Sequence, residues 1–259
     1  MNLVNLCNNT IIRMKIIISP AKKLNTDIDC ENAKMHTLFL KESEELIRVL
    51  QKMSVSEIKG LMGLSNNLAQ LNWQRFQDWS IKNVNTYKAI ELFNGAVYES
   101  MNIKEFDSAD YKFAQENLRI LSGLYGVLKP QDLILPYRLE MGTKLHYNDS
   151  SNLYHFWGDK LHNYIVKELN GERLINLASV EYSKVLKLAK LKTNIITPVF
   201  KDYKNGKLKV ISFFAKKARG EMCNYIIKNK ITNMDDLCLF ENLGYQFQEF
   251  ANDEILFIR

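Results

Sequence analysis

The chain has 259 residues, of which 46% are hydrophobic and 25% are charged, and its formal net charge is +6. A chain of this length and composition can bury a full hydrophobic core, which excludes an intrinsically disordered protein. No stretch approaches about 18 uninterrupted apolar residues, and the N-terminus lacks the basic region and long apolar run of a secretory signal. We therefore expect a soluble cytoplasmic protein that does not bind a membrane.

Cofactor and metal chemistry has little support in the sequence. The four cysteines are widely spaced without a C-x-x-C motif, which is typical of reduced thiols in a reducing compartment. The four histidines form no H-E-x-x-H motif, and no Walker loop or dinucleotide fingerprint is present. Ser19-Pro-Ala-Lys22 matches S-x-x-K but lacks the helix start and partner motifs of that chemistry. We expect no metal and no cofactor, and the catalytic residues, if any, stay unknown.

The first thirteen residues differ from the rest of the chain. MNLVNLCNNTIIR shows no periodicity, whereas MKIIIS, from Met14, has the pattern of a buried strand. We favour an internal start at Met14, a domain over 14–259 and a non-family extension over 1–13. No function is assigned to that extension.

The first predicted elements are one strand and three helices. A β-branched run over Lys15–Ser19 predicts a buried strand. Apolar residues at helical spacing predict a helix within 38–50, and further helices are expected over Ser54–Gly63, which begins with a capping pair, and over Ser65–Trp79. These helices are expected to pack as one amphipathic cluster.

Helices and strands follow each other through the rest of the chain. The patterns predict, in order, a helix over Ser108–Leu121, a helix over Phe156–Leu169, a strand over Leu174–Leu177, a lysine-bearing helix over Glu181–Leu191, strands over Asn194–Tyr203 and Lys207–Phe214, a helix over Ala215–Lys230, and strands over Tyr245–Phe250 and Ile255–Ile258. Asn205-Gly206 is a strong hairpin signal. Without repeats or linkers, we expect an α+β fold, a single domain with a mixed β-sheet packed by helices.

Positive charge is concentrated in residues 183–230. This window holds thirteen Lys or Arg against Asp202 and Glu221, a formal charge of about +11, so the rest of the chain carries about −5. Clustered cations repel one another unless an anion neutralises them, which favours a polyanionic partner. The candidate contacts are Lys184, Lys187, Lys207, Lys209, Lys216, Lys217 and Arg219. The alternative is a solvated lysine face, produced by the lysine-rich and asparagine-rich composition of an AT-rich genome.

A glycine-bracketed segment precedes this window. Gly123-Leu124-Tyr125-Gly126 follows one predicted helix and precedes a second that would begin near Lys129. This arrangement resembles a helix-hairpin-helix element, in which glycines allow close approach to a phosphate and a helix N-terminus offers free N–H groups. Gly123, Tyr125, Gly126 and Lys129 are therefore further candidate DNA contacts. An ordinary helix cap followed by a turn is the alternative.

Polar residues in four other strings could form a pocket. The end of a predicted strand followed by polar side chains is where open α/β sheets often bind ligands. The candidate residues are Ser19, Lys22, Arg138, Glu140, Asp159, Asn176, Ser179 and Glu181. The alternative is a buried structural network of Tyr137, Arg138 and Glu140, since such ion pairs are often architectural.

Five sequence blocks carry a family resemblance. They are IIISPAKKL (16–24), LSGLYGVLKPQDLILPYRLEMG (121–142), FWGDKL (156–161), INLASVEYSK (175–184), and PVFKD (198–202) with ISFFAKKARG (211–220). In order and spacing they resemble the signature blocks of the YaaA family of bacterial peroxide-stress proteins, from about Met14 to the C-terminus. The block after Tyr245 is only loosely similar.

The resemblance implies a cytoplasmic bacterial protein that protects cells from hydrogen peroxide by limiting free intracellular iron and the resulting DNA damage. It also implies DNA binding through a positively charged cleft and a helix-hairpin-helix element, which would fall on Ser122–Leu133 here. Lys216, Lys217 and Arg219 match the lysine-arginine block of the family.

These observations lead to one main hypothesis. The chain would bind the DNA backbone without base specificity, on duplex or on branched or locally melted DNA, where Tyr125 could stack on an unpaired base. How DNA binding would lower free iron does not follow from the sequence. The rival is an enzyme with a pocket for a phosphorylated small molecule or nucleotide beside the basic cleft. A scaffold that recruits another protein is a third possibility, and a non-enzymatic role is favoured.

Overall fold

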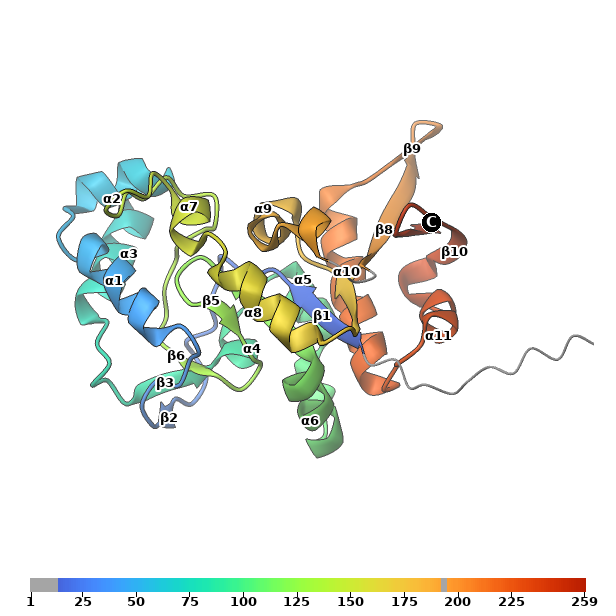
Figure 1. The fold of residues 1–259 in the computed structure, drawn as a ribbon, viewed down its shortest axis with the longest axis horizontal. Coiled ribbons are helices and arrows are strands. Elements are labelled where there is room, and N and C mark those ends of the chain that lie inside the picture. Colours follow the sequence, from blue (N-terminus) through green and yellow to red (C-terminus); the bar gives the residue numbers. More distant parts are fainter. Residues whose placement is uncertain (1–13, 192–194) are drawn as a thin grey trace, which may run out of the picture.

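A short buried strand at the start of the domain lies at the centre of the main sheet. The computed structural model of the chain describes residues 14–191 and 195–259 (Figure 1). The expectation of an extension over 1–13 lies outside these ranges, as does Asn194. Strand β1 (Met14–Ile18) pairs in parallel with β4 (Leu118–Ser122) on one side and with β7 (Arg173–Asn176) on the other. Its isoleucines are fully buried because a central parallel strand is covered on both faces.

Within the described ranges the main sheet has eight strands, in the order β10-β11-β8-β7-β1-β4-β5, with β9 paired to β8. The other strands are β5 (Gly126–Leu128), β8 (Ile195–Lys204), β9 (Lys207–Lys209), β10 (Gln246–Ala251) and β11 (Glu254–Ile258). Strands β11, β8, β7, β1 and β4 are mutually parallel, and β5, β9 and β10 are antiparallel to their neighbours. The parallel strands therefore all end at one edge of the sheet, here called the carboxyl edge, and begin at the opposite amino edge.

A helical cluster and a small second sheet form one end of the molecule (Figure 1). The helices are α1 (Leu40–Leu50), α2 (Val55–Met62) and α3 (Asn66–Asp78), and the strands are β2 (Glu31–Asn32), β3 (Asn85–Lys88) and β6 (Leu133–Ile134). Ser54 accepts the N–H of Glu57, whose carboxylate accepts the N–H of Ser54, so the predicted capping pair is confirmed. The three predicted helices of this region are confirmed within two residues at each boundary.

The remaining helices pack around the main sheet. They are α4 (Ala89–Leu92), α5 (Ala96–Met101), η1 (Ile103–Glu105), α6 (Ser108–Asn117), α7 (Leu153–Trp157), α8 (Lys160–Leu169), α9 (Val180–Ser183), η2 (Lys184–Leu186), η3 (Leu188–Lys190), α10 (Ser212–Lys228), α11 (Met234–Cys238) and η4 (Asn242–Gly244). The fold is α+β, a single domain with a mixed sheet packed by helices, as predicted. The hairpin at Asn205-Gly206 is also confirmed, with both residues at positive φ, and so is the closing strand pair.

The prediction of a helix over Ser108–Leu121 is wrong in its last turn. Helix α6 ends at Asn117, and the next five residues form β4. The buried guanidinium of Arg119 donates to the carbonyls of Gln115, Glu116 and Leu118, which satisfies the free carbonyls at the end of the helix. A short apolar run fits a helix or a buried strand equally well, and pairing with β1 decides for the strand.

The predicted helix-hairpin-helix element over Ser122–Leu133 is wrong as well. The segment Gly123–Tyr125 joins β4 to β5 as a tight β-turn, and turn residues followed by β6 replace the second helix. The Ser122 hydroxyl accepts the N–H of Tyr125 at 2.9 Å and fixes this turn. The two flanking strands form ladder hydrogen bonds inside the core, which a helical hairpin could not do.

Three further boundaries differ from the predictions. The helix expected over Phe156–Leu169 is divided into α7 and α8 by Gly158, at φ 47°. The helix expected over Glu181–Leu191 breaks into α9 and two 3-10 turns, because Lys187 adopts a left-handed conformation at φ 50°. Strand β9 is shorter than expected and α10 begins at Ser212.

The packing of Gly123 generates a prediction about stability. A Cβ on Gly123 would lie 2.3 Å from the carbonyl oxygen of Leu139, whereas a Cβ on Gly60, within α2, would meet no atom within 4 Å. We expect Gly123→Ala to lower the free energy of unfolding by about 2 kcal/mol or more, through overpacking. Gly60→Ala should raise it by about 1 kcal/mol, through helix propensity. Urea unfolding of both variants measures this, and equal effects of the two would contradict the packing described.

A buried carboxylate links α6 to the end of α10. The side chain of Asp110 is 3% exposed and accepts hydrogen bonds from Lys228, at 2.8 Å, and from Lys230. Burial alone would raise the pKa of Asp110, but these hydrogen bonds outweigh it and lower the pKa to about 2. A carboxylate with a lowered pKa stabilises the fold above its unfolded pKa of about 3.9, and this contribution is lost as the pH falls toward 2.

We therefore expect Asp110→Asn to reduce the free energy of unfolding at pH 7 by about 1–2 kcal/mol, because both lysines are partly exposed and screened. The difference from the wild type should shrink between about pH 4 and pH 2. Unfolding in urea across this pH range measures it. The control, Asp78→Asn on an exposed surface, should change stability by less than about 0.5 kcal/mol at each pH. A pH-independent loss for Asp110→Asn would contradict the linkage.

Candidate functional site

The segments that follow β1 and β7 meet at the carboxyl edge of the sheet. From β1 the sheet continues to β4 on one side, and from β7 it continues to β8 on the other, so the strand order changes direction between them. Such a switch point is where open α/β sheets commonly bind ligands. Ser19 and Ser179 lie there: the Ser19 Oγ accepts the N–H of Ser179 at 2.9 Å, and the two hydroxyls are 3.2 Å apart. Tyr98 donates to the Ser19 carbonyl at 3.0 Å.

Charged side chains surround this contact. Glu140 binds Lys22 at 2.5 Å and Arg138 at 3.2 Å, so one carboxylate joins two cations. Glu181 accepts the N–H of Gly142 at 3.0 Å. Asn176 accepts the N–H of Ala178 at 3.2 Å, which shapes the turn after β7. Seven of the eight predicted pocket residues thus lie at this edge, and we call them the carboxyl-edge cluster: Ser19, Lys22, Arg138, Glu140, Asn176, Ser179 and Glu181.

The eighth predicted pocket residue, Asp159, is separate from the cluster. Its side chain is 65% exposed and forms an ion pair with Lys187, which lowers the pKa of Asp159. No hydrogen bond or ion pair joins Asp159 to the cluster in the described part of the chain. Lys187, a predicted DNA contact, is therefore partly neutralised inside the protein.

Two half-buried arginines, one in the cluster and one on α10, each have a buried donor atom without an acceptor. The Nε atoms of Arg138 and Arg219 are buried and have no hydrogen-bond partner among the described residues. Burial lowers the pKa of Arg219. Arg219 lies one turn before Cys223 on α10, and Cys223 lies close to Tyr98. Because an arginine Nε can only donate, each of these groups could bind an oxygen of a ligand.

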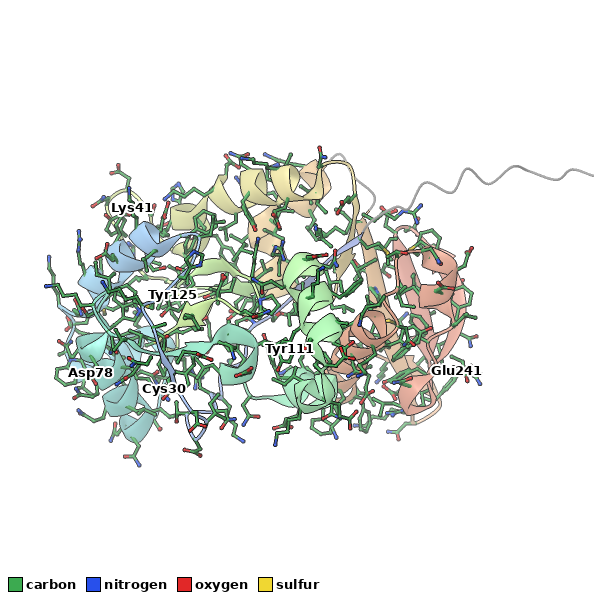
Figure 2. The ribbon with its side chains drawn as sticks, turned by 90° about the horizontal axis from the view of Figure 1, so that it is seen from below. Cys30, Lys41, Asp78, Tyr111, Tyr125 and Glu241 are labelled. Carbon is green, nitrogen blue, oxygen red and sulfur yellow. The ribbon has the colours of Figure 1, made fainter. Side chains whose placement is uncertain are left out.

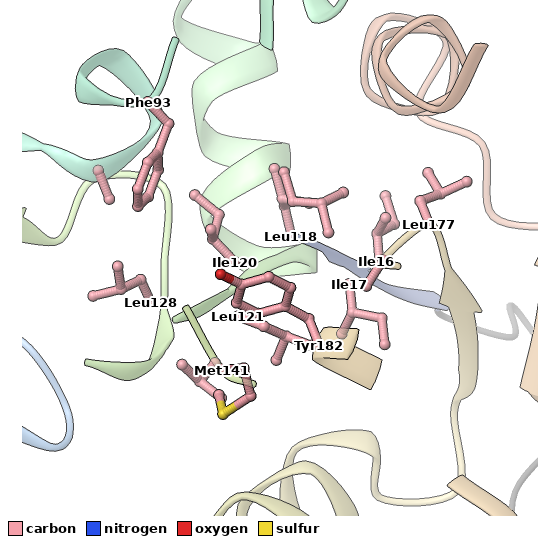
Figure 3. Packing of buried hydrophobic residues seen from close by; sticks show 14 of the residues in the cluster. Ile16, Ile17, Phe93, Leu118, Ile120, Leu121, Leu128, Met141, Leu177 and Tyr182 are labelled. Atoms are coloured by element: carbon pink, nitrogen blue, oxygen red, sulfur yellow. The ribbon is translucent and has the colours of Figure 1, made fainter. Parts of the chain in front are cut away.

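Three tyrosines lie beneath the cluster. Tyr98, Tyr137 and Tyr182 are at most 7% exposed, and burial raises the pKa of each hydroxyl. Figure 3 shows Tyr182 among buried residues of β1 and β4, including Ile17 and Leu121. These hydroxyls stay protonated at neutral pH and act as hydrogen-bond donors rather than nucleophiles. The contribution of Tyr98 was missed in the sequence, because the short helix α5 that carries it has no clear periodic pattern.

The predicted DNA contacts of the 123–129 segment are not on one surface. Tyr125, labelled in Figure 2, is fully buried. Its hydroxyl contacts Trp79 at 2.9 Å and the backbone of Leu135. Gly123 and Gly126 are buried too, the latter against Trp157. A fully buried ring cannot stack on a base in this conformation, so the role expected of Tyr125 is wrong here. Lys129 follows β5 and lies at the amino edge, beside the first residues of β1.

The β8–β9 hairpin and the first turns of α10 carry lysines without counter-charges. We call this the lysine hairpin surface: Lys201, Lys204, Lys207, Lys209, Lys216 and Lys217. No ion pair to any of them is found in 14–191 or 195–259. The hairpin projects from the body at the upper right of Figure 1. Lys184 is also exposed but lies over the ring of Tyr154, at 5.1 Å.

Residues 183–230, here called the basic window, contain two acidic residues, and both bind groups other than the lysines of the hairpin surface. The buried Asp202 accepts hydrogen bonds from the hydroxyl of Tyr245 and from Arg259 Nε, each at 2.9 Å. Glu221 accepts a hydrogen bond from Asn242. Neither carboxylate forms an ion pair with a lysine of the hairpin surface. Lys204 and Lys207 are moreover directly opposite each other in the strand pairing, where like charges repel.

Exposed aromatic rings accompany these lysines. Tyr203 is 67% exposed within the hairpin, and Phe213 is 56% exposed at the start of α10. The ammonium of Lys217 lies over the Phe213 ring, 4.9 Å from its centre. Sequence reasoning assigned base stacking to Tyr125 and overlooked Tyr203, although a Tyr next to Lys204 and the Asn205-Gly206 turn was a visible signal.

No group of three or more His, Cys, Asp or Glu in the described ranges is arranged to hold a metal ion. Among the helices of that part of the chain, none is both long and apolar enough to span a bilayer.

The fold and the site define a single-domain α+β protein with a polar cluster and a lysine-bearing hairpin at the carboxyl edge of a mixed sheet. Comparison with known proteins is consistent with this class. The family model described as Peroxide stress protein YaaA matches residues 14–251. The chain therefore belongs to the YaaA family of peroxide stress proteins.

Curated relatives cover almost the same length. A UPF0246 protein of Teredinibacter turnerae is 48% identical over 246 residues, which is 93% of this chain and 96% of the relative. A UPF0246 protein of Saccharophagus degradans is 46% identical over 254 residues, or 95% and 99% of the two chains. One of Flavobacterium psychrophilum is 50% identical over 240 residues, or 90% and 94%.

Proposed function

We propose that this peroxide stress protein binds the DNA backbone without base specificity, through the lysine hairpin surface. The observation that carries the proposal is the set of six lysines without counter-charges, next to two acids that are engaged elsewhere. Phosphate oxygens would neutralise these lysines and release counterions, which is the main source of non-specific affinity for DNA. Backbone contacts of this kind position a protein on DNA but do not read its sequence.

The form of DNA follows from the exposed rings. Tyr203 and Phe213 lie beside the lysines and could stack on unpaired bases, since base–aromatic stacking is sequence-tolerant. We therefore include branched or locally melted DNA, together with duplex, among the targets. Lys184 and Arg219 lie outside the defined surface, and Lys129 faces the other edge, so these residues are secondary in the proposal.

The link to oxidative stress comes from the family. Binding of this protein to DNA would protect DNA during peroxide stress and would accompany a reduction in free intracellular iron, as the family resemblance implies. No contact among the described residues supplies a route from DNA to iron, and that part of the proposal comes from the family.

The experiment is a salt series of DNA binding. We compare the wild type with the quadruple variant Lys204→Gln, Lys207→Gln, Lys209→Gln, Lys216→Gln, on duplex DNA and on DNA with an unpaired bubble. If all four lysines contact phosphates, the slope of log affinity against log salt on the duplex should become less negative by about 3–4. Fluorescence anisotropy measures both affinities.

The control removes the same charge from the opposite end of the molecule: Lys41→Gln, Lys52→Gln, Lys59→Gln, Lys82→Gln, all four being exposed. This variant should bind DNA with a slope near that of the wild type. If the slope of log affinity against log salt changed equally in both variants, DNA affinity would depend on net charge alone and not on this surface. The absence of DNA binding at low salt would also reject the proposal.

A second candidate function is an enzyme that uses the carboxyl-edge cluster. It is favoured by the buried Arg138 Nε without an acceptor, beside the Lys22–Glu140 pair and two contacting serine hydroxyls. These donors suit the phosphate or carboxylate of a small molecule. Turnover of nucleotides and sugar phosphates would be screened by 31P NMR. Any activity of this site should be lost in Arg138→Gln and kept in the quadruple lysine variant, and the converse would reject this candidate.

A further inference from the structure

A second polar pocket lies away from the carboxyl edge, beside the residues where the chain leaves β5. It has a volume of about 740 Å³ and is formed by residues 36–38, the end of α6, residues 129–132 and the last turns of α8. This volume lies within the range of about 300–1,000 Å³ that is typical of small-molecule sites. The pocket contains none of the lysine hairpin surface and none of the carboxyl-edge cluster, so the proposed DNA-binding role does not use it.

The two lysines of the pocket are free to bind a ligand. Lys129 and Lys167 line the pocket, and neither has an ion pair in the parts of the chain that the structure describes. Both lining carboxylates have other partners. Glu168 accepts a hydrogen bond from Arg119 Nε at 2.6 Å, and Asp132 accepts the backbone N–H of Lys129 at 2.9 Å. The charge of Lys129 also acts on Asp132 and Glu168, but over a distance longer than an ion pair. In the described ranges both ammonium groups can therefore still bind an anion.

Two neutral side chains of the pocket can also donate hydrogen bonds to a ligand. The hydroxyl of Thr37 is buried and has no hydrogen-bond partner among the described residues. The carbonyl oxygen of the Gln115 side chain accepts the N–H of Gln131 at 2.9 Å, which leaves its amide nitrogen as a donor. A buried hydroxyl without a partner is unusual in a native protein, and a ligand oxygen would satisfy it.

The two neighbouring pockets do not combine two unpaired lysines with an unsatisfied hydroxyl among the described residues. A pocket of about 520 Å³ contains Lys112 and Lys88, of which Lys88 is paired with Glu31 at 2.8 Å, and no described hydroxyl of this pocket is buried without a partner. A pocket of about 420 Å³ shares Lys129 but adds Lys15, which is paired with Glu172, and Arg119, whose guanidinium already makes four hydrogen bonds. Free cations and an unsatisfied hydroxyl occur together in the 740 Å³ pocket.

We propose that this pocket binds a small phosphate ester. The phosphate lies between the ammonium groups of Lys129 and Lys167 and accepts the Thr37 hydroxyl, because a phosphate has several strong acceptor oxygens for these donors. The organic part of the ligand contacts Leu38, which is 56% exposed, and Val127. The exposed leucine beside charged groups is thereby covered when the ligand is bound.

The experiment measures binding of AMP, ribose 5-phosphate and inorganic phosphate to the full chain by isothermal titration calorimetry. We expect saturable binding of at least one ester. Lys129→Gln and Lys167→Gln should each weaken it about tenfold. Lys112→Gln, a lysine of the neighbouring 520 Å³ pocket, is the matched control and should leave the affinity unchanged.

Thr37→Val separates a ligand contact from a structural role. The substitution keeps the side-chain shape and removes the hydroxyl, so the melting temperature should be equal or higher while the affinity for the ester falls about threefold or more. An unchanged affinity in Thr37→Val would show that the hydroxyl does not contact the ligand.

Three results would overturn the proposal. They are the absence of saturable binding of either ester at millimolar concentration, binding that survives the double variant Lys129→Gln, Lys167→Gln, and binding that is lost in Arg138→Gln instead. The last result would place the ligand at the carboxyl-edge cluster. Circular dichroism of each variant confirms that it is folded. DNA binding through the lysine hairpin surface, which contains neither Lys129 nor Lys167, serves as an independent activity.

Discussion

The parallel pairing of β1 with β4 on one side and with β7 on the other is the constraint on which the rest of the structure depends. Parallel neighbours cannot be joined by a tight turn, so each connection must cross back over the sheet before the next strand begins. All segments that follow a parallel strand are therefore collected at one edge, and all segments that precede one are collected at the other. Residues as distant in sequence as Ser19 and Ser179 come into contact for this reason.

The two edges have different chemistry. The carboxyl edge holds Glu140 between two cations, two serine hydroxyls in contact, and the hairpin that carries unpaired lysines. Beside the amino edge is a pocket lined by a buried hydroxyl and by two lysines that form no ion pair with a described residue. A polyanion and a small phosphate ester could thus be bound by one domain without competing for the same side chains.

The basic window is not a single functional unit. Lys228 and Lys230 hold Asp110 in place and Lys187 pairs with Asp159, so these cations have structural partners. The lysines of the hairpin and of the first turns of α10 have no carboxylate partner within 14–191 or 195–259. A charge count along the sequence gives the total but cannot separate these two groups, because the partners lie up to 120 residues away.

The segment from Leu118 to Glu140 is a second case in which the sequence does not show which polar groups have partners in the fold. Arg119, Ser122, Tyr125 and Tyr137 are polar or charged, and each could have faced solvent. In the structure their polar atoms bind backbone groups or other side chains, including Glu168 and Trp79, and Ser122 contacts Tyr137 at 2.6 Å. These hydrogen bonds satisfy buried groups and fix the β4–β5 hairpin, so glycines that resembled a DNA-binding turn serve internal packing instead.

The sequence by itself determined the features that depend on neighbouring residues. The three helices of the first cluster, the capping box at Ser54, the hairpin at Asn205-Gly206, the α+β class and the family all follow from local pattern or from short ordered blocks. Seven of the eight residues predicted for a pocket also lie together. Five of them lie at or after the ends of β1 and β7, which end at the same edge, and the pairing of Glu140 with Lys22 and Arg138 joins the other two. Only the tertiary structure decided that 118–122 is a strand, that Tyr125 is buried, that Lys129 lies at the opposite edge and which lysines are unpaired. Each of these outcomes is set by contacts between residues far apart in sequence, and the free energy of those contacts exceeds the local preferences that a sequence pattern records.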